Sequence, residues 1–184
     1  MHEAEKFGLS YDLVDDLTGA KLGRAKSGTF RTADVVGLDT LGHVIRTMQD
    51  TLPDDPFHPV YATPPVLATL IAGGSLGQKT GAGFYKKSGK DILRYDAAKQ
   101  DYAPSGAKVD ELIARMLKEK DPAKRLRALH DASHPQAQFL WSILRDAFHY
   151  IAVHLDSIAE TARDIDLALR WGFGWTQGPF EFCL

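Results

Sequence analysis

The 184-residue sequence has one cysteine (Cys183), no asparagine, and no apolar run near the roughly 18 residues of a membrane helix. A lone cysteine cannot form an internal disulfide, which is typical of a reducing compartment. Basic residues number 22 and acidic residues 24, so no positive excess favours nucleic-acid binding. The N-terminus also lacks the apolar segment of a secretory signal. These absences predict a soluble, cytoplasmic protein that binds neither nucleic acid nor membranes.

The residues that are present predict a mainly all-α fold. Hydrophobic residues make up 44% of the chain, enough for an ordinary globular core at this length. Helical spacing of apolar residues, with capping residues and glycine or proline stops, marks each predicted helix. We expect helices over 11–18, 30–36, 38–52, 65–72, 109–117, 122–129 and 135–155, with a last one capped by Asp164 and running to Arg170.

One segment departs from this helical pattern. Short apolar and aromatic runs separated by polar turns predict a small β-meander near 84–103. A linker at Pro104–Gly106 then divides the chain into two predicted regions, 1–104 and 105–184.

Two segments resemble one another, which predicts a duplicated unit. In the first, Asp15 precedes Gly28 by 13 residues; in the second, Asp166 precedes Gly178 by 12. Each segment reads as a short helix, a glycine-rich turn and the start of a further helix. The first copy continues well past Phe30, so we expect the second to be truncated and the chain to come from a longer polypeptide.

The motifs Ser27–Val44 (SGTFRTADVVGLDTLGHV) and Leu76–Tyr85 (LGQKTGAGFY) strongly resemble the C-terminal helical domain of the 3-hydroxyacyl-CoA dehydrogenases. The segment Asp164–Phe182 (DIDLALRWGFGWTQGPFEF) resembles the opening of a second such domain. The resemblance covers about residues 1–85 and 136–184. The tandem order is similar to large fatty-acid β-oxidation proteins that join the dehydrogenase to an enoyl-CoA hydratase.

This resemblance implies a parent enzyme that oxidises 3-hydroxyacyl-CoA to 3-ketoacyl-CoA with NAD. In that family a Rossmann domain holds NAD, a His–Glu pair is the general base, and an asparagine in the first helix of the helical domain positions the substrate. This chain has no G-x-G-x-x-G turn after a strand, no histidine in the catalytic context and no asparagine. We therefore expect no catalytic or cofactor-binding residue here, and an inactive chain that closes over the acyl-CoA and pairs helical domains.

The loop Lys26, Ser27, Gly28, Thr29 and Phe30 is the predicted substrate-binding segment. Its backbone N–H groups open a helix, where the dipole favours a carbonyl or phosphate oxygen. The alternative is an ordinary helix start capped by Thr29. Asp34 and Asp39, which flank the next turn, are expected to cap or bracket helices.

Other motifs have plainer interpretations. Gly77–Thr80 approximates a phosphate-binding loop, but Gln78 interrupts it, although Lys79 could cover a CoA phosphate. His130 and His134 are four residues apart and could bind a metal, but Pro135 breaks that helix, so we expect no metal site.

The aromatic residues Trp171, Phe173, Trp175 and Phe180 predict packing on the long helix and, compatibly, part of an interface between the two helical domains. Because the second unit is truncated, we expect some apolar surface to stay uncovered and the chain to self-associate. A stand-alone helical module that binds a protein partner is the alternative to the dehydrogenase interpretation.

Overall fold

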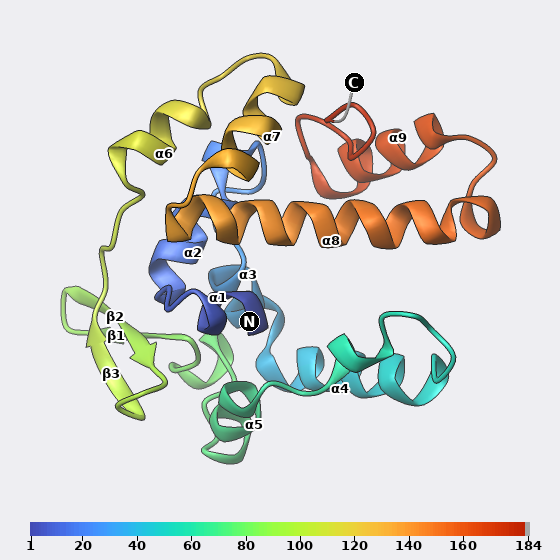
Figure 1. The fold of residues 1–184 in the computed structure, drawn as a ribbon. Helices are drawn as coiled ribbons and strands as arrows, with labels where there is room; N and C mark the ends of the chain where they lie inside the picture. Colours follow the sequence, from blue (N-terminus) through green and yellow to red (C-terminus); the bar gives the residue numbers. More distant parts are fainter. Residues whose placement is uncertain (183–184) are drawn as a thin grey trace.

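Helices dominate the part of the chain that the computed structural model describes, residues 1–182 (Figure 1). Cys183 lies outside the described residues. In chain order the α-helices are α1 (His2–Lys6), α2 (Tyr11–Thr18), α3 (Phe30–Val36), α4 (Leu38–Thr51), α5 (Pro65–Ala72), α6 (Glu111–Met116), α7 (Pro122–Asp131), α8 (Pro135–Ile158) and α9 (Ala162–Phe173). Short 3₁₀ turns lie at Ala20–Leu22, His58–Tyr61 and Gln78–Thr80.

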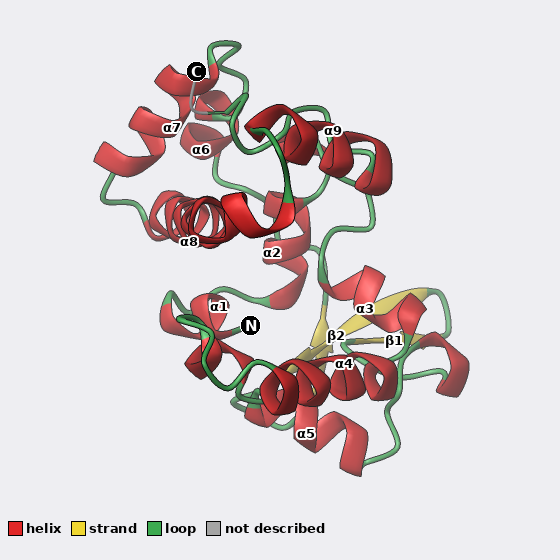
Figure 2. Cartoon of the chain, turned by 90° about the vertical axis from the view of Figure 1, so that its right-hand side faces the viewer, coloured by secondary structure: helices red, strands yellow, loops and turns green. Residues whose placement is uncertain are grey.

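The predicted meander is confirmed as an antiparallel sheet of β1 (Tyr85–Ser88), β2 (Asp91–Asp96) and β3 (Asp101–Pro104), in that order. Tyr85 faces Arg94 in the first strand pair, and Tyr95 faces Tyr102 in the second. The turn at Gly89 has positive φ, which glycine adopts at little cost. The sheet lies beside α3 rather than under a layer of helices (Figure 2).

Helix α2 lies at the centre of the molecule because it contacts α3, α8 and β2 (Figure 2). Its buried face, which includes Tyr11, Val14 and Leu17, is spaced at i, i+3 and i+6. The rings of Tyr11, Phe30 and Phe84 pack with centroids 4.5 to 5.0 Å apart, so the core joins α2, α3 and the start of β1. Aromatic packing of this kind contributes beyond the area that it buries.

The long helix α8 is covered over its first half only. Ala137, Phe139, Leu140 and Leu144 are buried, whereas Val153 and Ile158 in the second half are 47% and 62% exposed. The wide apolar stripe therefore predicted the central position correctly for the N-terminal half. The C-terminal half projects beyond the core beside α9 (Figure 1).

Helix α9 begins earlier than the sequence suggested. Thr161 is the N-cap, and Asp164 is the third helical residue, whose side chain binds back to the Thr161 backbone N–H. This reciprocal capping box satisfies two free donors. The expectation that Asp164 caps the helix is wrong because a threonine three residues upstream takes that place, and the helix runs to Phe173.

Candidate functional site

The start of α3 is held by a buried aspartate from the neighbouring helix. The Asp15 carboxylate accepts hydrogen bonds from the backbone N–H groups of Thr29, Phe30 and Arg31, at 2.6 to 3.0 Å. Gly28 has a φ of +69°, and a Cβ placed there would lie 2.7 Å from the Asp15 Cα. The glycine therefore permits the close approach that lets Asp15 cap the next helix.

The second segment repeats this arrangement. Asp166 accepts hydrogen bonds from the backbone N–H groups of Phe180 and Glu181, at 2.8 and 3.0 Å. A Cβ at Gly178 would overlap the Asp166 side chain. The sequence repeat thus corresponds to the same local structure in both copies. In each copy the carboxylate of a helical aspartate accepts the backbone N–H groups that lie two and three residues after a glycine.

A second buried carboxylate ties the sheet to α3. Asp34 accepts hydrogen bonds from the backbone N–H groups of Phe84 and Tyr85, both at 2.8 Å, and the Tyr85 hydroxyl donates to Asp15 at 2.6 Å. Burial raises the pKa of both aspartates, and these hydrogen bonds oppose that rise. Asp34 therefore binds the loop before the sheet, and the expectation that it caps or brackets a helix is wrong.

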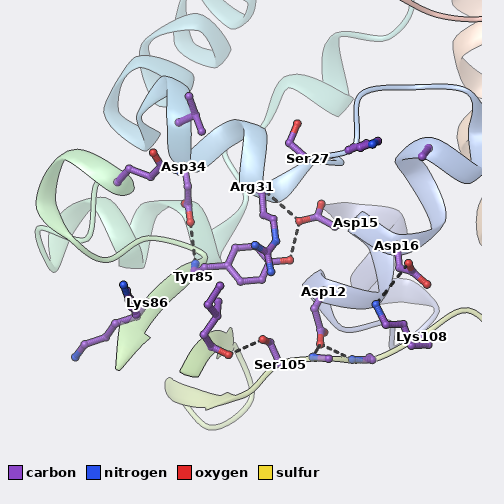
Figure 3. Close-up of a pocket in the computed structure, with 18 of the residues that line it drawn as sticks. Asp12, Asp15, Asp16, Ser27, Arg31, Asp34, Tyr85, Lys86, Ser105 and Lys108 are labelled. Carbon is purple, nitrogen blue, oxygen red and sulfur yellow. Dashed lines mark hydrogen bonds and ion pairs between the residues drawn. The ribbon is translucent and has the colours of Figure 1, made fainter. Parts of the chain in front are cut away.

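Beside these carboxylates lies an open cleft of about 1160 Å³ (Figure 3). Its walls come from α2, the loop before α3, α3 itself, the β1–β2 hairpin and residues 105–108. Lys26 and Ser27 line it, together with Arg31, whose guanidinium lies 4.6 Å from the centre of the Tyr85 ring. The structure thus places the first two residues of the predicted substrate loop at a surface cleft.

The other three residues of that loop have internal roles. Gly28, Thr29 and Phe30 do not line the cleft, and Phe30 is 1% exposed. The N–H groups of Thr29 and Phe30 donate to Asp15, so these two groups already have an acceptor within the protein. Binding of a substrate oxygen by the loop 26–30 stays a prediction. Thr29 does not cap α3 with its hydroxyl either, because that hydroxyl bonds to Thr18 at 2.9 Å.

The two copies meet at the turn that precedes each cap. The Thr176 N–H donates to the Gly23 carbonyl at 3.0 Å, and the Arg24 guanidinium lies 4.0 Å from the centre of the Trp175 ring. Burial lowers the pKa of Arg24 to about 10. A cation stacked on an aromatic face inside a junction is a specific contact, and it joins the first copy to the second.

The predicted aromatic cluster divides into two parts. Trp175 packs in this junction, and Phe180 is half-buried, with its backbone N–H bound to Asp166. Phe182, which lies outside the predicted cluster, packs on Phe148 of α8 with ring centroids 5.8 Å apart. Trp171 and Phe173 are 78% and 69% exposed, so the prediction that they pack on the long helix is wrong. An apolar groove between α8 and α9, lined in part by Ile151 and Leu169, lies in the same region.

The two histidines considered for a metal have structural contacts. His130 packs edge-on against Trp141, and His134 accepts a hydrogen bond from the Gln136 N–H at the start of α8. Over residues 1–182, no three His, Cys, Asp or Glu side chains gather as a metal site would require. Lys79 forms an ion pair with Asp39, with oxygens at 2.6 Å, so this lysine joins the Gln78–Thr80 turn to α4.

Sequence reasoning missed a polar cluster between the proline-rich loop and α8. The side chain of Asp55 is 4% exposed and lies 3.1 Å from His154 and 3.3 Å from the Tyr150 hydroxyl. Tyr61 donates a hydrogen bond to Tyr150 at 3.2 Å. These residues lie about 90 positions apart in the chain, so no local spacing could have indicated them.

Within the described residues, no helix is both long enough and apolar enough to cross a membrane. The described sheet is antiparallel and has three strands, whereas dinucleotide sites are built where a parallel strand passes through a glycine-rich turn into a helix. The residues that the structure describes therefore do not fit NAD.

Comparison with known proteins shows which family the sequence matches. The model of the 3-hydroxyacyl-CoA dehydrogenase C-terminal domain matches residues 2–87. A Bacillus subtilis protein named "Probable 3-hydroxyacyl-CoA dehydrogenase" is 36% identical over 98% of this chain and 23% of its own length. A Deinococcus radiodurans protein of the same name is 47% identical over 51% of this chain and 26% of its own length.

A Rickettsia prowazekii protein, named as a fatty acid oxidation complex trifunctional enzyme, is 23% identical over 98% of this chain and 24% of its own length. The chain thus spans about a quarter of the length of the curated relatives that it matches.

Proposed function

Residues 2–87 belong to the 3-hydroxyacyl-CoA dehydrogenase C-terminal domain family, and from that premise we propose that this chain is the substrate-closing and domain-pairing part of such an enzyme. The full enzyme would oxidise 3-hydroxyacyl-CoA to 3-ketoacyl-CoA with NAD in fatty-acid β-oxidation. The observation that carries the proposal is the duplicated Asp–Gly cap, since each cap builds one helical unit and the turns before the caps join the two units.

Two features support the closing role. The cleft beside α3 is open to solvent and is bordered by Lys26, Ser27 and Arg31, which can reach a bound acyl-CoA from one side. The buried carboxylates of Asp15 and Asp34 fix the walls of the cleft, because each of them binds a segment from another element. A preorganised wall of this kind orients a substrate without reorganising when it binds.

The pairing role is supported by the junction of the two copies. The contacts of Gly23 and Arg24 with the turn at Trp175 and Thr176 lie inside one chain. NAD would be held by a Rossmann domain elsewhere in the full enzyme, and hydride transfer would take place against that domain. An enoyl-CoA hydratase domain is a further proposed partner.

The proposal can be tested in a chimera. The segment of the Bacillus subtilis relative that matches this chain would be replaced by the present sequence, and NADH formation from 3-hydroxybutyryl-CoA would be measured. We expect turnover from the chimera and none from the 184-residue chain alone. NADH formation by the isolated chain would refute the proposal, and so would a chimera that melts like the relative yet is inactive.

A further inference from the structure

The structural repeat begins further upstream than the two aspartate caps. Ser10 and Thr161, the N-cap residues of α2 and α9, are 151 positions apart, and so are Asp15 and Asp166. At the same spacing, α1 corresponds to residues 153–157, which belong to the second half of α8. Each copy therefore starts as a helical hairpin, formed by α1 and α2 in the first copy and by the second half of α8 and α9 in the second.

The two copies face each other across an approximate twofold axis. The guanidinium of Arg24 stacks on the ring of Trp175, which is its own counterpart at the spacing of 151 positions. Beside this contact, Gly23, the counterpart of Gly174, accepts the hydrogen bond from the Thr176 N–H. A residue that touches its own counterpart lies on the axis of a twofold-related pair, and every other contact between the two units then occurs twice.

The hairpin of the first copy is covered by the first half of α8. Helices α1 and α2 both contact α8 (Figure 1, Figure 2), and the buried residues of α8 all lie between 137 and 144. On the hairpin, Ala4, Val14 and Leu17 are at most 2% exposed. The first half of α8 thus packs on the inner face of the hairpin.

The corresponding face of the second hairpin is open. A groove of about 680 Å³ lies there between α8 and α9 and is lined mainly by apolar side chains. Ile158, the counterpart of the half-buried Phe7, is 62% exposed, and Ala168, the counterpart of the buried Leu17, is also exposed. The second copy therefore has the same apolar positions as the first without the helix that covers them.

We propose that this groove binds an amphipathic helix, the counterpart of the first half of α8, which directly precedes residue 1 in the full enzyme. Helix α8 begins at Pro135, 18 residues before Val153, the counterpart of His2. A counterpart of its first half therefore stands before residue 1, and the twofold relation places it against α8 and α9. The longer enzyme rests on the proposed function, whereas the helical form of the occupant rests on the geometry of the repeat.

The groove also defines the chemistry of this helix. Its inner face must carry apolar residues at helical spacing, as the first half of α8 does. At the rim, Glu160 and Asp164 replace Leu9 and Leu13 of the first copy. Among residues 1–182, Glu160 has no ion-pair partner. We therefore expect a lysine or arginine beside the apolar stripe, because complementary charges fix the register of a docked helix.

A labelled peptide tests this inference on the 184-residue chain. The peptide consists of the roughly 20 residues, more than five helical turns, that precede the matching segment of the Bacillus subtilis relative. Fluorescence anisotropy should show saturable binding, and a scrambled peptide should not bind. Ala168→Glu puts a carboxylate into the apolar groove and should weaken binding about tenfold. The matched control Ala152→Glu adds the same charge at an exposed position of α8 outside the groove and should leave binding unchanged.

Three results would overturn the inference. The first is no saturable binding of the peptide at millimolar concentration. The second is equal weakening by the two variants, which would reflect net charge and not a groove. The third is self-association that Ala168→Glu abolishes in a chain that does not bind the peptide, because the groove would then belong to a second copy.

The chimera separates this inference from the proposed function. It contains the preceding segment of the relative, so Ala168→Glu should lower its melting temperature and Ala152→Glu should not. An active chimera in which the two variants melt alike refutes the docked helix and leaves the proposed function standing. An inactive, folded chimera that only Ala168→Glu destabilises refutes only the proposed function.

Discussion

Replacing Asp15 by alanine tests the structural centre of the first copy. The carboxylate receives three backbone N–H groups at the start of α3 and the Tyr85 hydroxyl, and it is 7% exposed. One side chain therefore connects α2, α3 and β1. Its removal leaves four donors without their acceptor, two of them in fully buried hydrogen bonds.

The magnitude follows from those donors. A buried donor that loses its acceptor costs about 1–3 kcal/mol, and hydrogen bonds to a charged group are the stronger kind. Part of this cost is offset, because burial raises the pKa of Asp15 and the lost charge was itself expensive to bury. We expect Asp15→Ala to lower the free energy of unfolding by about 3–5 kcal/mol, a large share of the roughly 5–15 kcal/mol typical of folded proteins.

Urea unfolding followed by circular dichroism measures this loss, and a double-mutant cycle with Tyr85→Phe assigns its origin. Tyr85→Phe alone should cost about 1–2 kcal/mol, but almost nothing when Asp15 is already alanine, because the hydroxyl then has no acceptor to lose. The control Asp156→Ala, at an exposed position near the end of α8, should change the stability little. A coupling energy near zero between Asp15 and Tyr85 would refute the assigned contact.

Three further outcomes are expected. Gly28→Ala should destabilise by several kcal/mol and Gly74→Ala by only about 1 kcal/mol, because both have positive φ but only Gly28 lies against another chain segment; equal losses on urea unfolding would refute the close approach. Burial alone would raise the pKa of Asp12, but hydrogen bonds from Ser10, Ala107 and Gly106 outweigh it and lower the pKa. The contribution of this carboxylate to the stability of the fold is therefore full at a pH above its usual pKa of 3.8, and it is lost as the pH falls through the lowered pKa. Asp12→Asn should therefore cost about 1–3 kcal/mol at pH 7 and progressively less below pH 3.8, as urea titrations at several pH values would show. Light scattering at tens of micromolar should find the chain self-associated and a Trp171→Ser/Phe173→Ser variant less so, because both side chains are exposed; a monomeric unmodified chain would contradict this.

The sequence predicted the elements of the fold better than the contacts between them. Helix starts and stops lie in local signals, such as the glycine after α2 or the proline that opens α8, and these agreed with the structure to within a few residues. The predicted start of α9 was wrong because two nearby residues, Thr161 and Asp164, both have side chains that favour an N-cap. Only the backbone conformation decides which of them precedes the helix. The division at residue 104 stays a prediction.

The candidate site shows why the rest could not be predicted locally. Lys26 and Ser27 were identified from a motif, and the structure places both at the cleft. The lysines of the hairpin also line this cleft, and nothing in their spacing along the chain reveals that α3 lies opposite them.

The cap on α3 was assigned to the adjacent Thr29, although the acceptor is Asp15, which lies 14 residues earlier. The repeat held the missing signal. An aspartate and a glycine recur 12 or 13 residues apart in both copies. In each copy the glycine lies against the aspartate, so a direct contact between the two residues explains why both recur. Read as a contact, that spacing identifies Asp166 as the cap of the second copy as well. Asp166→Ala should then destabilise less than Asp15→Ala, because Asp166 holds two N–H groups where Asp15 holds three and a hydroxyl.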